Sequence, residues 1–323
     1  MQQSLTETVK LNKKQKPDKK RFDFNKFLKD CKKQKYLILL CIPAFLVVLI
    51  FNYFPIYGIL IAFKEYNPAE GIMGSKWVGL KYFQFFIKDP YSLIIVKNTL
   101  LLGLYSLLWS FPAPIILALL LNEIKNKYFK KIVQTISYFP NFISAVIIVG
   151  LLKQLAGDDG LFNIIRSFFG APPVLFFAEK GWFRTLYIGS GIWQGLGWGS
   201  IIYLAALSGV DTELYEAAEI DGANRWHKAI HITIPAMLPT ITILLILSTS
   251  SIISVGFEKV MLMYNPSIYE VSDVISTYVY REGIQGARFS YTTAVGLIQS
   301  IVAFILIYFS NLVSRKVSET SLW

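Results

Sequence analysis

Residues 36–63 read YLILLCIPAFLVVLIFNYFPIYGILIAF, a stretch that contains no charged side chain. An α-helix rises about 1.5 Å per residue, so roughly 20 apolar residues cross a hydrocarbon core about 30 Å thick. A cleaved secretory signal has an apolar core of only roughly 7–15 residues. The length of this stretch therefore predicts a transmembrane helix that is retained in the protein.

Five further apolar stretches follow, and they lie at about 95–121, 132–153, 184–208, 236–257 and 291–313. Pro140 interrupts the third stretch and several glycines interrupt the fourth. In the whole chain 54% of residues are hydrophobic and 16% are charged, whereas about a quarter are charged in ordinary soluble proteins. We predict an all-α integral membrane protein with about six transmembrane helices.

The formal net charge of +11 is concentrated in the residues before the first apolar stretch. The cations there are Lys10, Lys13, Lys14, Lys16, Lys19, Lys20, Arg21, Lys26, Lys29, Lys32, Lys33 and Lys35. A basic block beside a transmembrane helix binds anionic membrane lipid and stays in the cytoplasm, so its position argues against a nucleic-acid partner. We predict a basic cytoplasmic segment at 1–35 and a transmembrane domain at 36–323.

Loops rich in Lys and Arg mark the cytoplasmic side of a membrane protein. Such residues lie between the second and third stretches and after the sixth, and they are Lys125, Lys127, Lys130, Lys131, Arg315 and Lys316. The segments at about 64–94, 154–183 and 258–290 mix acidic residues with a few cations, and we predict that they lie outside. Both termini and the loop at about 208–239 are then cytoplasmic.

The cytoplasmic loop contains LYEAAEIDGANRWHKAIHITIP at 214–235. Asp211 or Thr212 can cap a helix there, and Gly222 permits the left-handed turn that ends it. A second short helix can follow until Pro235, where we expect the chain to change direction and re-enter the membrane. Two short helices of this kind can dock in a groove of another protein.

The spacing of this loop resembles the signature of permease subunits of type I ATP-binding-cassette importers. That signature is Glu-Ala-Ala, three residues, Gly, nine residues and Ile-x-Leu-Pro, and residues 216–235 match it with Ile234 in place of Leu. The resemblance implies the type I permease fold and a multi-pass protein of the bacterial plasma membrane. It also implies that the loop is a coupling helix, which transmits closure of the ATPase dimer to the membrane helices.

The roles implied by the resemblance follow the motif residue by residue. Glu216 is the candidate for an ion pair with the ATPase, Ala217 and Ala218 for close packing, and Gly222 for the turn. The complete set of candidate coupling residues is Glu216, Ala217, Ala218, Gly222, Ile232 and Pro235.

Four further segments resemble the carbohydrate-uptake branch of the family, and they are residues 54–58, 77–80, 203–211 and 264–266. This similarity implies an oligosaccharide substrate and an extracytoplasmic solute-binding protein. It also implies a second permease subunit, as a heterodimer, and two ATPase subunits. The sequence contains no Gly-x-x-x-x-Gly-Lys-Ser/Thr run, so ATP and Mg are expected on the partner ATPase. The chain itself is predicted to be no enzyme and to bind no cofactor.

Polar and aromatic residues inside apolar stretches often mark a substrate path. The candidates are Trp193, Gln194, Trp198, Tyr203, Ser250 and Ser254. The alternative is that they serve helix packing and interfacial anchoring. The glycines at 189–199 are interpreted as sites of close helix packing.

Two other readings of the sequence are less well supported. His227 and His231 have the i, i+4 spacing of metal ligands, but no Glu or Cys completes a site, so we predict no metal. An ATP-independent secondary carrier or channel is the alternative function, and for a carrier we expect intramembrane acidic residues that couple ions. The apolar stretches do not clearly offer them.

Overall fold

The computed structural model describes residues 33–317, and the predicted basic segment at 1–35 therefore lies almost wholly outside the described residues. The chain divides into two units at Tyr57 and Gly58, and each is described by itself.

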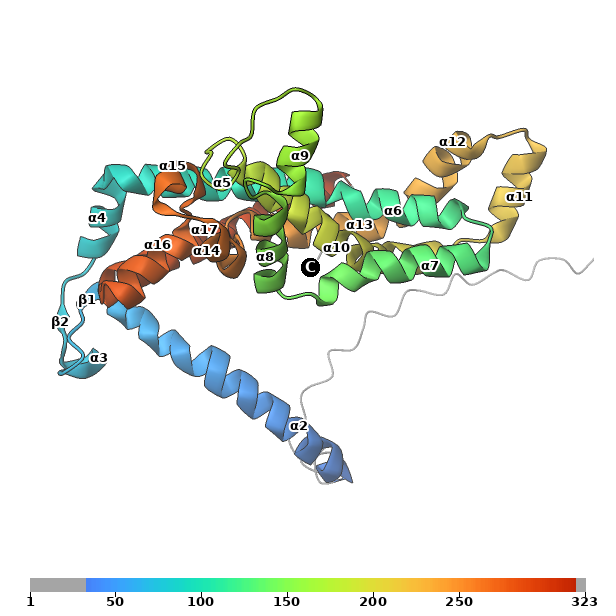
Figure 1. Cartoon of the computed structure of the whole chain (residues 1–323). Coiled ribbons are helices and arrows are strands. Elements are labelled where there is room, and N and C mark those ends of the chain that lie inside the picture. The colour runs from blue at the N-terminus through green and yellow to red at the C-terminus, as the bar shows by residue number, and fades with distance from the viewer. Residues whose placement is uncertain (1–32, 318–323) are drawn as a thin grey trace, which may run out of the picture. The chain divides into compact units, whose positions relative to one another are not determined.

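The first unit contains α2 (Lys35–Val48) and a π turn, η1 (Leu49–Tyr53), and the 3-10 helix η2 (Phe54–Phe63) leads from it into the second unit. Together they form one apolar helix from Lys35 to Phe63 (Figure 1). No side chain of α2 or η1 is buried. A helix that is hydrophobic on all sides must be covered by lipid or by another chain. The first predicted transmembrane helix is thus confirmed.

Three helices of the second unit are also long and apolar enough to cross a membrane. They are Pro90–Glu123, Arg225–Thr249 and Phe289–Leu312. The first combines α5 (Pro90–Ser110) and α6 (Pro112–Glu123), and the last lies within α17 (Phe289–Val317). The predicted stretches at 95–121 and 291–313 fall on these helices.

The third predicted stretch is not one helix. It divides into α7 (Lys127–Tyr138), a 3-10 turn η3 (Phe139–Phe142) and α8 (Ala145–Leu155), and the two parts meet at 101°. Pro140 lies in the turn, and Ser144 starts a new helix because its side chain accepts a hydrogen bond from the backbone of Ile147. The predicted interruption at Pro140 is confirmed, and the stretch at 132–153 crosses the membrane only if the bent pair is one span.

Helix α10 (Phe183–Leu207) occupies the fourth predicted stretch and packs against α5, α6 and α7. It is not among the helices apolar enough to count as candidate spans. Among the described residues there are four such helices, or five if the bent pair is one span. The predicted number of six stays a prediction, and it depends on α10.

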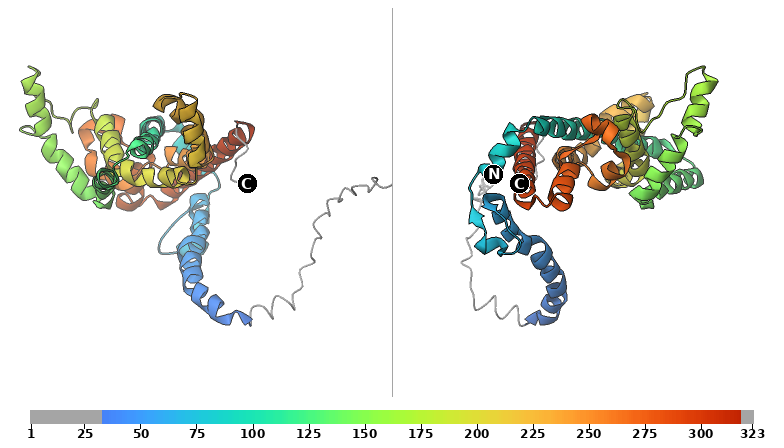
Figure 2. Two further views of the ribbon diagram at one scale, coloured as in Figure 1. Left: turned by 90° about the vertical axis from the view of Figure 1, so that its right-hand side faces the viewer. Right: turned by 60° about the vertical axis from the view of Figure 1, so that its left-hand side comes forward.

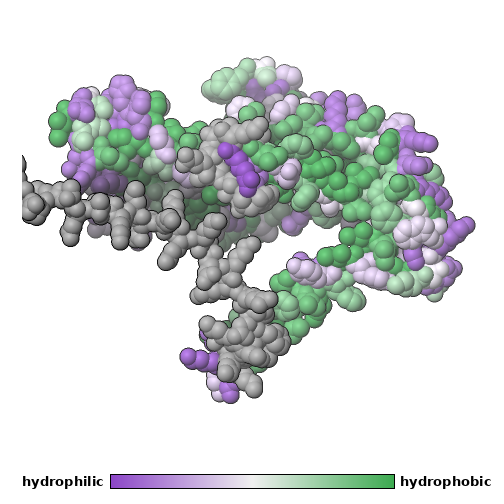
Figure 3. Space-filling view, turned by 180° about the vertical axis from the view of Figure 1, so that it is seen from behind, coloured by the Kyte–Doolittle hydropathy of each residue, from purple (hydrophilic) through white to green (hydrophobic). Residues whose placement is uncertain are grey.

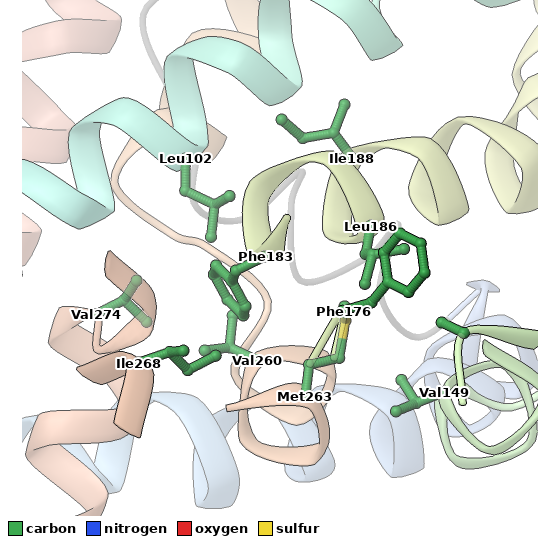
Figure 4. Packing of buried hydrophobic residues seen from close by; sticks show 11 residues of the cluster. Leu102, Val149, Phe176, Phe183, Leu186, Ile188, Val260, Met263, Ile268 and Val274 are labelled. Atoms are coloured by element: carbon green, nitrogen blue, oxygen red, sulfur yellow. The ribbon is translucent and has the colours of Figure 1, made fainter. Parts of the chain in front are cut away.

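Buried apolar residues hold the second unit together at several places. One cluster joins α5, α8 and α10 to α14 (Phe257–Met263), and Figure 4 shows Phe183 between Leu102 and Val260. Phe183 is only 2% exposed. Full burial of one such side chain stabilises a fold by about 1.5–3 kcal/mol. The cluster therefore fixes the start of α10 against the segments that follow α13 (Ile234–Thr249).

The connecting segments form short elements. These are β1 (Lys64–Glu65), α3 (Gly71–Gly74), β2 (Lys76–Trp77), α4 (Lys81–Lys88), α9 (Leu161–Phe168), η5 (Ser250–Ile252), η6 (Pro266–Ile268), α15 (Tyr269–Ser272), α16 (Ile275–Val279) and η7 (Tyr280–Gln285). The two strands pair antiparallel, with Lys64 opposite Trp77.

Segments that were predicted to share one side of the membrane contact one another. On the predicted outer side, the hydroxyl of Tyr91 donates to Asp273 at 2.6 Å. On the predicted cytoplasmic side, Arg225 lies 3.8 Å from Glu123. Figure 3 shows hydrophobic side chains over the middle of the second unit and more hydrophilic ones towards its ends. This distribution fits a helix bundle placed in a bilayer.

Candidate coupling loop and substrate path

The predicted coupling loop begins with α11 (Thr212–Ile220), which stands beside the turn between α6 and α7 (Figures 1 and 2). Asp211 caps this helix, because its carboxylate accepts a hydrogen bond from the backbone of Glu213 at 3.0 Å. Glu213 lies in the first turn, where the helix dipole favours an acidic side chain. The sequence offered Asp211 or Thr212 as the cap, and the structure selects Asp211.

Gly222 ends α11 with a φ of +77°. Its N–H donates to the carbonyl of Glu219 at 3.1 Å, and the N–H of Ala223 donates to Ala218 at 2.8 Å. These bonds satisfy carbonyls that the end of a helix leaves without partners. The predicted left-handed turn at Gly222 is confirmed.

The chain does not change direction at Pro235, and that prediction is wrong. From α12 (Arg225–Lys228) it continues through a π turn, η4 (Ala229–Thr233), into α13, so that Arg225–Thr249 is one helix. A proline in a regular helix removes a hydrogen bond and clashes with the carbonyl four residues before it. The π turn just before Pro235 alters that bonding pattern, and the helix therefore continues.

Polar contacts link the two arms of the loop, which are α11 and the helical segment from α12 to η4. Lys228 donates to Glu219 at 2.6 Å, and this hydrogen bond and the charge of Lys228 hold the pKa of the Glu219 carboxyl below its usual value. The hydroxyls of Tyr215 and Thr233 lie 3.1 Å apart. The ion pair of Arg225 with α6 ties the loop to the bundle. Movement of the loop can therefore reach α6 and α13.

The outer surface of the loop is exposed and partly apolar. Glu216 and Ala217 are exposed, and Ile220 and Trp226 are 87% and 76% exposed. A groove of about 420 Å³ lies between the arms, and its lining is Ala218, Asp221, Gly222, Ala223, His227, Lys228, His231 and Ile232. Large apolar side chains on a loop outside the membrane are typical of a docking surface.

The candidate path residues on α10 lie on different faces. Trp193 borders an apolar pocket of about 570 Å³ between α8, α9 and α10. Gln194 donates to the carbonyl of Ile143 at 3.0 Å, and Trp198 meets the ring of Phe142 edge to face. Successive helical residues turn by about 100°, so Gln194 and Trp198 share a face that Trp193 does not.

The remaining candidates are more scattered. Tyr203 is 3% exposed and packs in a cluster with Ala118, Leu207 and Met237. Ser254 is exposed in the connection after η5. The backbone of Ser250 begins η5, and its side chain is outside the described part of the structure.

The glycines of α10 serve two purposes. A Cβ on Gly197 would lie 2.0 Å from the carbonyl of Ser137, and one on Gly199 would lie 2.9 Å from Pro114. Close packing explains these two. A Cβ on Gly189 or Gly195 would meet nothing within 4 Å. Within the described part of the chain no close packing explains these two glycines, and Gly195 borders open space on the same face as Gln194 and Trp198.

Comparison with known proteins identifies the family. Residues 110–319 match the model of the binding-protein-dependent transport system inner membrane component. The chain belongs to this permease family. It is 45% identical over 291 residues to the polygalacturonan/rhamnogalacturonan transport system permease protein YteP of Bacillus subtilis, with 90% of this chain and 91% of that protein covered.

Two further likenesses cover most of this permease. It is 29% identical to the arabinooligosaccharides transport system permease protein AraP of Bacillus subtilis, over 85% of this chain and 86% of that one. The crystal structure of a bacterial ABC transporter involved in the import of the acidic polysaccharide alginate contains a chain that is 41% identical. That chain superposes with a TM-score of 0.84, over 91% of this permease and 99% of its own length. The expected permease fold is thus confirmed, and the chain is a transport subunit of an inner membrane complex.

Two cations of the permease beside α10 were not among the functional residues predicted from the sequence. Lys259 of α14 donates to the carbonyl of Tyr187 at 2.9 Å, and its Nζ lies 4.9 Å from that ring. Burial lowers the pKa of the Lys259 ammonium to about 8. Arg184 donates from Nη2 to Asn98 at 3.2 Å. A Lys and an Arg beside apolar stretches were the available signal, but nothing in the sequence shows which cations lack an acidic partner.

Proposed function

We propose that this permease belongs to an ATP-driven importer of oligosaccharides. In this proposal, an extracytoplasmic binding protein delivers the sugar, and the helix bundle moves it by alternating access. The observation that carries the proposal is 45% identity, over nine-tenths of the chain, to a permease named for polygalacturonan/rhamnogalacturonan transport. The relatives named for arabinooligosaccharides and alginate support the same substrate class.

The partners in this proposal are a second permease, forming a heterodimer, and two ATPase subunits that hold ATP and Mg. The neighbouring structure of an alginate transporter with a sugar-bound periplasmic protein supports the binding protein as a partner. The exposed loop from α11 to α12 supports docking of an ATPase at Glu216, Ala217 and Ala218. In this arrangement both termini face the cytoplasm.

The coupling proposal needs more than contact between the subunits. An ATPase can bias the bundle only if its open and closed states contact the loop differently. The Gly222 turn and the Lys228–Glu219 pair support a stiff loop that can transmit such a difference. Ile232 and Pro235 lie where the loop continues into the membrane helix that ends at Thr249.

For the substrate path we propose the face of α10 that carries Gln194 and Trp198, with Ser254 at its outer side. An aromatic ring and hydrogen-bonding side chains beside open space are features of a sugar site. The other residues predicted from sequence, Trp193, Tyr203 and Ser250, stay predictions.

The test is uptake by vesicles that contain the complex, purified through a tag on this chain from its native host. Vesicles with ATP inside and binding protein outside are expected to accumulate a labelled uronate or neutral oligosaccharide. The control is the same vesicles with ADP inside. Equal uptake with ATP and ADP would favour the secondary carrier or channel and contradict the importer.

A further inference from the structure

One face of α10 combines glycine, cationic, polar and aromatic residues. Residues 184, 187, 191, 194, 195 and 198 follow the spacing of a single helical face. A Cβ on Gly191 would meet the Nζ of Lys259 at 3.5 Å, with no closer neighbour, and one on Gly195 would meet nothing within 4 Å. This face is therefore not closed by another helix at these two positions.

Lys259 reaches this face from α14. Its ammonium group has one hydrogen-bond acceptor in the structure, the carbonyl of Tyr187, although it can donate three hydrogen bonds. Burial of the group is sufficient to lower its pKa. An anion placed on the open side, next to Gly191, would accept the remaining bonds and stabilise the charged form.

Arg184 lies on the same face, one turn before Tyr187. Its Nη2 is bonded to the neutral amide of Asn98, and its Nε is buried without a partner. Arg184 is the second residue of α10, where the positive end of the helix dipole disfavours a cation and favours an anion. Positions 184 and 187 are separated by about 4.5 Å along the helix axis.

Among the residues that the structure describes, neither Arg184 nor Lys259 forms an ion pair with a carboxylate. Arg184 and Lys259 are both partly buried. A cation that is shielded from water without a counter-charge is costly, and in membrane proteins such groups mark ligand pathways. The positive charge of these two side chains on one face of α10 can be balanced by an anion from outside the chain.

We infer that Arg184 and Lys259 form an anion subsite at the outer end of the proposed path, and that it receives a carboxylate of an acidic, uronate-containing oligosaccharide. The inference rests on the proposed oligosaccharide transport. Gln194 and Trp198 continue the same face, and position 198 lies about 10 Å beyond position 191. The carboxylate of one sugar can then bind the cations while the oligosaccharide extends towards Trp198.

The relatives support a uronate over other anions. Alginate is named as an acidic polysaccharide in the transporter structure that resembles this chain, and polygalacturonan, named for another relative, is a polymer of a uronic acid. The guanidinium of Arg184 matches the planar geometry of a carboxylate.

The test is calorimetric titration of the purified complex, without binding protein, with trigalacturonate and with neutral galactotriose. The wild-type complex is expected to bind trigalacturonate at least tenfold more tightly than galactotriose. Lys259→Gln and Arg184→Gln are each expected to weaken trigalacturonate binding at least tenfold and to leave galactotriose binding within twofold. Lys259→Arg is expected to keep most of the affinity.

The matched control is Lys180→Gln, which removes an exposed cation on the same side that is paired with Glu270. It is expected to change neither affinity. Each variant is first checked for co-assembly with the ATPase, and Lys259→Arg separates loss of charge from loss of structure. Wild-type affinity for trigalacturonate in both Gln variants would overturn the inference, as would an equal loss for the two sugars. Binding of galactotriose but not of trigalacturonate would also overturn the anion subsite, but it would leave the proposal of oligosaccharide transport intact. Failure of ATP-dependent uptake by the vesicles would instead contradict the transport proposal.

Discussion

Gly222 forms the left-handed turn at the end of α11 in the proposed coupling loop. Its φ of +77° lies far from the value near −65° that a proline ring imposes, and its N–H is hydrogen bonded. Gly222→Pro is therefore expected to leave the protein in the membrane but to reduce ATP-dependent uptake at least tenfold. Gly222→Asn is the control, because Asn tolerates this conformation and keeps the N–H. Normal uptake by the proline variant would count against the coupling role.

Gly197 and Gly195 of α10 are a matched pair of positions at which helix packing can be tested. A methyl group on Gly197 collides with the backbone of Ser137, and overpacking of this kind costs about 1–3 kcal/mol. The same change at Gly195 meets open space, and Ala favours a helix over Gly by about 1 kcal/mol. Thermal unfolding in detergent is expected to show a lower apparent Tm for Gly197→Ala and an unchanged or higher one for Gly195→Ala. The reverse order would show that the helix contacts are described wrongly.

Among the elements on the predicted outer side, Asp273 joins α5, α16 and η7. Its carboxylate is fully buried and accepts hydrogen bonds from Tyr91, Arg281 and Thr277 at 2.6–2.7 Å. Asp273→Asn leaves the guanidinium of Arg281 without its counter-charge and is expected to cost about 3 kcal/mol. Glu270→Gln breaks an exposed ion pair on the same side, which contributes about 0–1 kcal/mol. Equal apparent Tm values for the two variants would contradict the structural role of Asp273.

The helices also show which features of the fold the sequence could predict and which it could not. Apolar length alone located the helices from Lys35 and from Phe289, because a bilayer demands that length. Pro140 signalled an interruption, but the 101° bend depends on how the following helix starts at Ser144. Pro235 suggested that the helix would end there. The π turn before Pro235 lets the helix continue, and no sequence pattern predicted this turn.

The candidate site also contains some features that the sequence predicts and others that it does not. The Gly222 turn was predictable because few residues adopt positive φ. The unpaired state of Lys259 was not, because Glu258 precedes it directly in sequence. Adjacent residues of a helix point in different directions, so this glutamate makes no ion pair with Lys259. Partners in space decide whether a cation is available to a ligand.

The whole molecule is one subunit of a larger transport complex of the inner membrane. The helix from Lys35 to Phe63 has an exposed, apolar surface. The proposed coupling loop also exposes two apolar side chains, Ile220 and Trp226, in a segment that is expected to meet water. Lipid or a second permease is expected to cover the first, and an ATPase the second.

The most direct test of the coupling role is crosslinking in native membranes from a cysteine in place of Ala217, which is exposed on α11. Cys31 and Cys41 are first replaced by Ser, and a short thiol-to-amine crosslinker is added, with Ser167→Cys on α9 as the control from the predicted outer side. The account predicts a crosslinked product with an ATP-binding-cassette ATPase for Ala217→Cys and none for Ser167→Cys. Absence of that product at 217, or its appearance at 167, would contradict the placement of the coupling loop.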